Sequence, residues 1–489
     1  MKRLFFGINV LVGVIFLYIM VIGLFSCSKK STKPPDRNPT INFNMDILPI
    51  LQARCNTSGC HSGATPADSA GGLVFPDFES MRQTVRKKMA ADPSEKTIIP
   101  SNADSSHLVQ NIRRQLQPFM PPDTFPPLTQ LEIGKIAAWI NQGAKGPNGE
   151  PFLAFDQGKI YVANSSDGTV DIIDPLINFK VGSIGTAPSG TPPSVVQTHH
   201  LVVSPDKKFV YVTNSWSLGD LVKIDAVGDS VLGRVRAGYQ PADIVISPDG
   251  QFVYTTDYTL GLSASTIAVV RKFRASTMSL VDTFPVGRAP HGVAVSKDGS
   301  LVLAPGQLSD DCWFIFPSTG TINRVRLSES VTNNPFNPSY VAQYEPFGVI
   351  FSKTDSLAYV SCSKNNQIRI INTNTQLVED IDSIVLSSTL GKSPYMMTLN
   401  AMGDTLYAAC RGSNTVAVID LTSKIAAYIP VGEFAHAPAL AKTKNRLYVA
   451  CEGNHTDPYK VYVIDTSANM VVDSIDVGRY PNGIAVLEP

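Results

Sequence analysis

The sequence predicts a multidomain protein in which a small all-α domain precedes an all-β propeller of seven blades. Three observations lead to this prediction. A charged start and a long apolar run open the chain, helical patterns surround a cysteine-histidine segment within 41–146, and a tyrosine-containing unit recurs from 155 to 489. The unit repeats roughly every 45 residues, a period typical of propeller blades.

The charge of the chain is evenly balanced. Lys and Arg total 41, Asp and Glu also total 41, and charged residues make up 17% of the sequence. A protein that binds nucleic acid through its phosphates needs a basic surface. We therefore expect no nucleic-acid partner.

The N-terminus predicts export. Lys2 and Arg3 precede an apolar run that ends at Leu24-Phe25-Ser26-Cys27, which resembles the lipobox of bacterial lipoproteins. The prediction is a signal peptide over 1–26, a lipidated Cys27 and a tether over 27–40, which place the protein in the cell envelope on the periplasmic side or at the outer membrane. An uncleaved membrane anchor is the alternative, since roughly 20 apolar residues span a bilayer.

Helical patterns bracket the segment 41–146. Asp46 is expected to cap a first helix that carries Ile47, Ile50 and Leu51 and tolerates Pro49 in its first turn. Thr129-Gln-Leu-Glu132 is a capping box before a last helix that ends near Gly143. The middle of the segment is expected to be irregular.

Two thiols followed at once by an imidazole stand between these helices, at Cys55-Asn-Thr-Ser-Gly-Cys60-His61. Each cysteine can form a thioether to a haem vinyl group, and the adjacent histidine can then bind the iron. Met120, in a proline-rich loop, offers a thioether as the second axial ligand. The alternatives are a Cys55–Cys60 disulfide, a zinc site, His107 as the distal ligand, and Met120 as loop packing.

This segment resembles the small cytochrome c domains of exported bacterial proteins. The resemblance rests on Asp46 to Leu51, Gly71-Gly72-Leu73, Ile98-Ile99-Pro100, Ser106-His107-Leu108, Met120-Pro121-Pro122 and Leu128 to Ala144. The four-residue spacing between the cysteines resembles a known variant of the usual two-residue spacing. The resemblance implies one covalent haem c over 41–146, with 147–154 as a linker.

The remaining two-thirds of the chain repeats one unit. Each unit has a short apolar strand, a turn such as Ser247-Pro-Asp-Gly250, a strand with a tyrosine and further alternating strands. The tyrosine strands are Tyr161-Val-Ala-Asn164, Tyr211-Val-Thr-Asn214, Tyr254-Thr-Thr-Asp257, Tyr359-Val-Ser-Cys362, Tyr407-Ala-Ala-Cys410 and Tyr448-Val-Ala-Cys451. Four strands with period-two patterning predict a propeller blade.

The number of repeats predicts how the propeller closes. Six complete units run from 194 to 478, whereas the unit at 160–181 lacks an innermost strand and 480–486 is such a strand alone. The two ends are therefore expected to complete a seventh blade and leave no open sheet edge. The region resembles the YVTN-repeat family of seven-bladed propellers. One repeat lacks the tyrosine and leads into 328–343, which is expected to be a loop.

Four cysteines lie in the propeller region. Cys362, Cys410 and Cys451 share one position in three consecutive repeats, and Cys312 is the fourth. Neighbouring blades pack about 10 Å apart, too far for a disulfide between equivalent positions. Buried free thiols are the prediction for the three equivalent cysteines, with a disulfide or a soft-metal role as alternatives.

The innermost strands align one residue per blade near the central channel. These residues are His199, Ala242, His291, Phe347, Tyr395, His436 and Asn482, and His200 lies beside the first of them. Histidines that converge on an axis can bind a transition metal or an anion. His199, His291 and His436 are thus a candidate site for a metal or a small-molecule ligand. Polar residues in solvated loops are the alternative.

Three functions follow from these features. The first is an exported, membrane-anchored c-type cytochrome that transfers electrons to or from a redox partner protein docked on the propeller. The second is an oxidoreductase whose propeller holds the substrate or metal and whose haem removes electrons. The third is a surface binding or structural module.

Overall fold

A computed structural model describes residues 41–57, 60–62, 70–92, 95–153, 158–215, 219–259, 267–379 and 383–489. Cys27, the predicted signal peptide and the tether lie outside these residues. Within the described ranges, no helix is both long and apolar enough to cross a bilayer.

The N-terminal part of the described chain is helical. Its elements are η2 (Phe43–Ile47), α2 (Leu48–Arg54), η4 (Ala70–Gly72), α3 (Phe78–Ala91), α4 (His107–Ile112) and α5 (Gln130–Asn141). η2 and α5 pack through the rings of Phe43 and Trp139, whose centroids lie 5.4 Å apart. Arg54 at the end of α2 pairs with Glu132 of α5 at 2.9 Å. The first and last helices therefore lie side by side.

The caps of these helices test two expectations. The capping box of α5 is confirmed: Thr129 Oγ1 accepts from the Glu132 N–H, and the Thr129 N–H donates to Glu132. The Asp46 cap is wrong, because the helical turns begin earlier, at Asn42, whose side chain accepts from the Met45 N–H. Asp46 instead accepts from the Asn42 N–H at 3.0 Å, so the two residues close the first turn together.

The expectation of an irregular middle is wrong for 78–91. α3 begins after Asp77, whose carboxylate accepts from the Ser80 N–H at 2.8 Å. Phe78, Met81, Val85 and Met89 are buried along one face, at the spacing of an amphipathic helix. This apolar spacing is present in the sequence, but the polar residues around it obscured the pattern.

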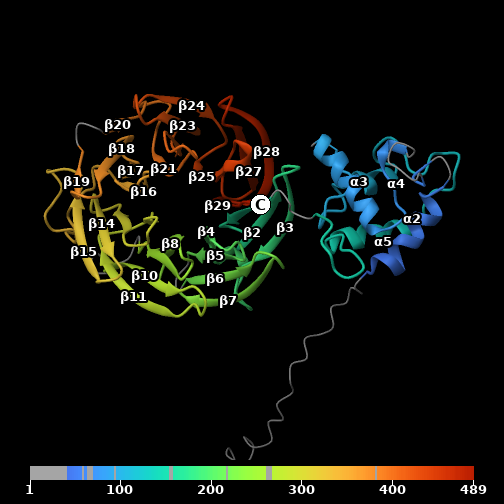
Figure 1. Cartoon of the computed structure of the whole chain (residues 1–489), viewed down its shortest axis with the longest axis horizontal. Coiled ribbons are helices and arrows are strands. Elements are labelled where there is room, and N and C mark those ends of the chain that lie inside the picture. The colour runs from blue at the N-terminus through green and yellow to red at the C-terminus, as the bar shows by residue number, and fades with distance from the viewer. Residues whose placement is uncertain are drawn as a thin grey trace, which may run out of the picture. The chain divides into compact units, whose positions relative to one another are not determined.

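The C-terminal part is a seven-bladed β-propeller, as expected (Figure 1). Blade 1 contains β29 (Pro481–Leu487), β1 (Lys159–Asn164), β2 (Thr169–Asp174) and β3 (Phe179–Gly185). Blade 2 contains β4 (Thr198–Val203), β5 (Phe209–Asn214), β6 (Asp220–Asp225) and β7 (Ser230–Arg236). Blade 3 contains β8 (Pro241–Ile246), β9 (Phe252–Asp257), β10 (Ala268–Arg274) and β11 (Leu280–Val286).

The other four blades repeat this order. Blade 4 contains β12 (Ala294–Val295), β13 (Val302–Gly306), β14 (Asp311–Phe316) and β15 (Thr321–Arg326). Blade 5 contains β16 (Pro346–Phe351), β17 (Leu357–Cys362), β18 (Gln367–Asn372), β19 (Leu377–Val378) and β20 (Ile384–Val385). Blade 6 contains β21 (Pro394–Leu399), β22 (Thr405–Cys410), β23 (Thr415–Asp420) and β24 (Ala426–Pro430), and blade 7 contains β25 (Ala435–Ala441), β26 (Arg446–Cys451), β27 (Pro458–Asp465) and β28 (Met470–Arg479). Two short helical turns, η5 (Pro193–Val195) and η7 (Lys442–Lys444), lie in connections.

The predicted closure is confirmed. β29 pairs antiparallel with β1, with Tyr161 opposite Ala485 and Val162 opposite Ile484. The last strand of the chain is thus the innermost strand of blade 1. β4, β8, β16, β21, β25 and β29 surround the centre of the ring in Figure 1. Blade 1 therefore has an inner strand only because the two ends of the propeller region combine in it.

The repeated tyrosines explain the repeat physically. All six are at most 5% exposed. The Tyr161 hydroxyl donates to the Ala226 carbonyl of blade 2, and the Tyr211 hydroxyl donates to the Ala275 carbonyl of blade 3, at 3.2 and 2.8 Å. Each of these two tyrosines packs its ring in the core, and its hydroxyl donates a hydrogen bond to a turn of the next blade.

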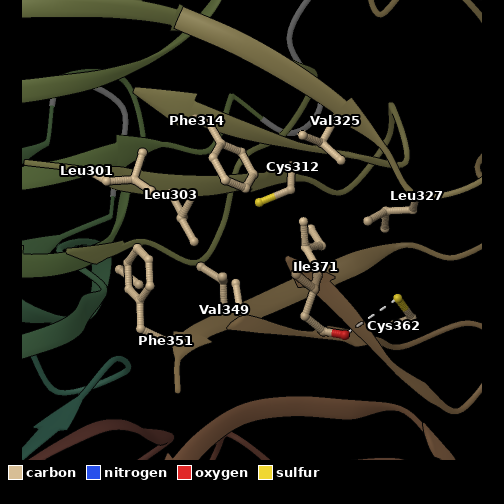
Figure 2. Packing of buried hydrophobic residues seen from close by; sticks show 13 residues of the cluster. Leu301, Leu303, Cys312, Phe314, Val325, Leu327, Val349, Phe351, Cys362 and Ile371 are labelled. Carbon is tan, nitrogen blue, oxygen red and sulfur yellow. Dashed lines mark hydrogen bonds between the residues drawn. The ribbon is translucent and has the colours of Figure 1, made fainter. Parts of the chain in front are cut away.

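Apolar side chains fill the space between neighbouring blades. Between blades 4 and 5 the cluster contains Leu303, Phe314, Val349, Phe351 and Ile371, together with Cys312 and Cys362 (Figure 2). The four propeller cysteines are buried free thiols, which confirms that expectation for Cys362, Cys410 and Cys451. Cys362 Sγ makes a long contact, of 3.7 Å, with the Val360 carbonyl.

The loop 328–343 joins β15 to β16 without a strand or helix, as expected. A buried carboxylate holds its end. Asp310 accepts from the Tyr340 hydroxyl at 2.8 Å and from the N–H groups of Tyr344 and Glu345 at 3.1 and 2.9 Å. The loop is therefore attached to the blade that precedes it.

Candidate functional sites

A cavity of about 640 Å³ lies within the helical part of the chain. The side chains of Cys55, Cys60, His61 and Met120 all line it, although Met120 lies sixty residues or so beyond the others. Leu73, Phe75, Leu108, Ile112 and Leu116 supply apolar walls. The volume and the apolar lining with a few polar groups suit a buried organic ligand.

His61 is fixed in orientation by a backbone carbonyl. Its ring is 7% exposed and lies 4.6 Å from that of Phe75. Nδ1 donates to the Leu73 carbonyl at 3.0 Å, which assigns the proton to Nδ1 because a carbonyl only accepts. Burial lowers the pKa of His61 below its usual value. A neutral ring held in this way leaves the Nε2 lone pair available for a metal.

The two cysteines lie at the start of a tight turn. Cys55 caps the end of α2, and the His61 N–H donates to the Cys55 carbonyl at 3.2 Å. Both cysteines are free thiols, not a disulfide. Burial raises the pKa of the Cys55 thiol to about 12. This segment thus presents two sulfurs and one imidazole to the same cavity.

Met120 is held by a residue that the sequence did not single out. Asn111 of α4 donates from Nδ2 to the carbonyls of Leu116 and Pro118 at 3.2 and 2.8 Å, and its own carbonyl accepts from the Met120 N–H at 3.2 Å. These bonds support the loop backbone that leads to the methionine, and the methionine itself. In the sequence, this role was indicated only by the position of an asparagine just before a proline-rich loop.

His107, the alternative distal ligand, also lines the cavity. Its Nδ1 lies 3.2 Å from Glu95 Oε1. A carboxylate partner keeps this imidazole in a polar pair at the start of α4.

A second site lies where the inner strands of the propeller meet. His199, His200, His291 and His436 each offer a ring nitrogen, and these nitrogens lie within 4.8 Å of one another. We call this set the four-histidine cluster. Three of its members were predicted, and His200, which was noted only as the neighbour of His199, is a full member. His200 and His199 come from β4 and His436 from β25, while His291 precedes β12.

Two cluster members pair with buried carboxylates. His200 Nδ1 lies 2.9 Å from Asp243 Oδ1, and His436 Nδ1 lies 2.7 Å from Glu452 Oε1. Their Nε2 atoms face each other at 3.3 Å. Burial lowers the pKa of His436, which favours a neutral ring despite the carboxylate.

His199 and His291 have fewer polar partners. The Nδ1 atom of each is buried without a hydrogen-bond partner among the residues that the structure describes. Burial, and then the neighbouring imidazoles, hold the pKa of both rings well below the usual value. The ring of Phe347 stacks on His291 at 3.7 Å and on Tyr395 at 3.9 Å, so aromatic side chains form one wall of the cluster.

Glu452 is not a member of the four-histidine cluster, but it holds His436 in place. The sequence did not predict this role. Its carboxylate also accepts from Arg411 at 2.8 and 2.7 Å and pairs with His455 at 2.8 Å. Burial opposes ionisation, yet the hydrogen bonds from Arg411 and His436 hold the pKa of Glu452 well below its usual value. A charged residue immediately after the buried strand β26 was the signal in the sequence.

Asp243 was also missed, although comparison of the repeats could have found it. The equivalent position is glycine in three blades, at Gly292, Gly348 and Gly483. A Cβ there would lie 2.5–2.7 Å from a backbone carbonyl of the next inner strand. Blades 2 and 3 instead carry His200 and Asp243, so the inner strands leave room for side chains there.

Comparisons with known proteins concern the propeller. A family model described as a lactonase with a seven-bladed β-propeller matches residues 200–334. A protein of unknown function from Desulfotomaculum acetoxidans is 18% identical, with a TM-score of 0.53, over 68% of this chain and 99% of that one. A candidate 6-phosphogluconolactonase from Bacteroides fragilis is 17% identical, with a TM-score of 0.51, over 69% and 99%. No curated protein matches. These likenesses show the propeller fold, which is related to that of lactonase-like proteins.

Proposed function

We propose that this chain is an exported, membrane-anchored c-type cytochrome that transfers single electrons through one covalent haem. The observation that carries the proposal is the cavity of about 640 Å³ on which Cys55, Cys60, His61 and Met120 converge. The donor set fits the group, because two thiols, an imidazole and a thioether are what covalent attachment and His/Met ligation require.

Each residue has a defined part in this proposal. Cys55 and Cys60 would attach the haem, and His61 Nε2 and the Met120 sulfur would hold its iron. When bound, the haem supplies reversible one-electron chemistry. The Leu73 carbonyl keeps the His61 ring in the tautomer and orientation that a metal ligand needs. The apolar walls at Ile112 and Leu116 limit the access of water.

The propeller would dock the redox partner or bind a small-molecule ligand, and a lipid on Cys27 would keep the protein at the membrane. The closed ring supports this role because it offers a rigid scaffold in which the last strand, β29, completes blade 1. The lipid anchor and the export of the chain rest on the N-terminal sequence alone.

The full chain, expressed with haem-maturation machinery, is expected to carry one covalent haem. Reduction should then give the α band of a c-type haem, and the haem should remain with the polypeptide after acidic organic extraction. The measurement is a reduced-minus-oxidised spectrum with a haem-to-protein ratio. A chain that is folded but lacks the band overturns the proposal.

Met120→Ala is expected to lower the reduction potential of the haem without loss of covalent attachment. A thioether favours reduced iron, and its removal leaves water or a harder ligand. The fall should be on the order of 0.1–0.3 V, within the ~0.8 V that axial ligands span. Met45→Ala is the control, since Met45 is 75% exposed on η2. An equal potential in wild type and Met120→Ala would assign the sixth position to another residue.

A further inference from the structure

We infer that the four-histidine cluster binds one divalent transition-metal ion, Zn²⁺ or Cu²⁺, at the centre of the propeller. The inference does not depend on the haem proposal, because it concerns a separate set of residues and a different metal. Imidazole is a ligand that both ions accept.

The distances suit a metal centre. Zn–N bonds of about 2.0–2.1 Å place neighbouring nitrogens of a tetrahedral site roughly 3.3–3.4 Å apart. The Nε2 atoms of His200 and His436 are already 3.3 Å apart. All four ligand nitrogens lie within 4.8 Å, so small ring rotations bring His199 and His291 to the same centre.

The polar contacts of His200 and His436 orient their Nε2 atoms toward each other. Asp243 and Glu452 contact the two Nδ1 atoms at 2.9 and 2.7 Å, and the two Nε2 atoms lie 3.3 Å apart in a buried site. A metal bound to both Nε2 atoms completes two carboxylate–histidine–metal arrangements of the kind common in metal sites.

The charge of the surroundings also favours a cation. Asp243 is 5% exposed, and its other contacts are the N–H groups of Val293 and Ile244 at 2.9 Å each. Within the described ranges no Lys or Arg pairs with it, whereas Glu452 has Arg411. A metal on His200 would place a positive charge one ring away from this buried carboxyl group.

His199 and His291 supply the remaining ligands. Their Nδ1 atoms are buried and have no partner in the part of the chain that the structure describes. Buried polar atoms in native proteins nearly always have a partner. The aromatic wall of Phe347 and Tyr395 shields the cluster, and a shell of this kind keeps water from competing for the metal.

The test uses the full chain, stripped with chelator and then titrated with Zn²⁺ or Cu²⁺ alone. We expect elemental analysis to find one non-haem metal ion per chain. The ion that binds with the higher affinity in the two titrations is the metal of the site. His200→Ala/His436→Ala should lose this equivalent, while Val227→Ala, on the propeller surface at 80% exposure, should keep it. Asp243→Asn should weaken affinity about 10–100-fold at unchanged stoichiometry, as expected for a positioning residue.

A measurement on the wild type alone keeps the test decisive if the double variant does not fold. Cu²⁺-loaded protein should show nitrogen hyperfine coupling from several imidazoles in its electron paramagnetic resonance spectrum. No bound metal, equal binding by a folded double variant, or oxygen-only coordination overturns the inference. None of these results bears on the haem spectrum, so the two proposals fail separately.

Discussion

Cys55→Ala/Cys60→Ala is expected to abolish covalent haem attachment completely. Among the residues that the structure describes, these two thiols are the only ones that line the cavity, and the other described cysteines are buried in the propeller. With neither sulfur present, haem could be held only by His61 and Met120 and would leave during acidic extraction. The measurement is haem-linked peroxidase staining after denaturing electrophoresis, with both proteins expressed alongside the maturation machinery.

The matched control is Cys362→Ala/Cys410→Ala, which also removes two buried thiols but from the propeller. It should retain the stain, with a stability loss of about 1 kcal/mol for each small cavity. Staining of a folded Cys55→Ala/Cys60→Ala protein contradicts the assignment of the attachment site. Wild-type protein without haem whose Cys55 and Cys60 resist alkylation would instead favour the disulfide alternative.

Deletion of 480–489 is expected to destabilise the propeller by more than about 5 kcal/mol. The deletion removes β29, and with it the inner strand of blade 1 and the pairing with β1. Ile484 packs in a cluster with Val162 and Ala437, and each large buried side chain contributes about 1.5–3 kcal/mol. β1 would become an open edge. Denaturant unfolding followed by fluorescence measures the loss.

Deletion of Pro489, which is exposed, is the control for this prediction. It leaves β29 intact and should change stability by less than about 0.5 kcal/mol, as for most surface changes. If the longer deletion gives no folded protein, Ile484→Ala replaces it, with an expected loss of about 2–5 kcal/mol. Val472→Ala, at 46% exposure, is its control. Equal stability of the two variants contradicts a closure through β29.

The helices and blades differ in how well local patterns predicted them. The capping box at Thr129 and the tyrosine repeat are local signals, and both were interpreted correctly. α3 was missed although Asp77 and the apolar spacing after it are also local. Asp46 was placed as a cap because acidic residues favour that position, but Asn42 took it and Asp46 bonded back to its N–H. Asn42 and Asp46 both favour cap positions, and Phe43, the residue after Asn42, packs on Trp139.

The candidate sites divide in the same way. Residue types at fixed spacing pointed to Cys55, Cys60 and His61, and a proline-rich loop pointed to Met120. Asn111 was not predicted, because its role depends on where α4 ends relative to the loop. Asp243 and Glu452 were not predicted either, because their partners lie in other blades. Such contacts join residues far apart in the chain, and no local pattern encodes them.

The sequence alone was enough for the seven blades, the closure by the last strand and the identity of most candidate ligands, because repeat period, alternation and side-chain chemistry are properties of short segments. The tertiary structure was needed to bring Met120 to the same cavity as His61 and to make His200 a full member of the cluster. It also supplied the bonds from Leu73, Asp243 and Glu452 that set which ring nitrogens are available. Those bonds depend on distances between elements, which arise only when the chain packs.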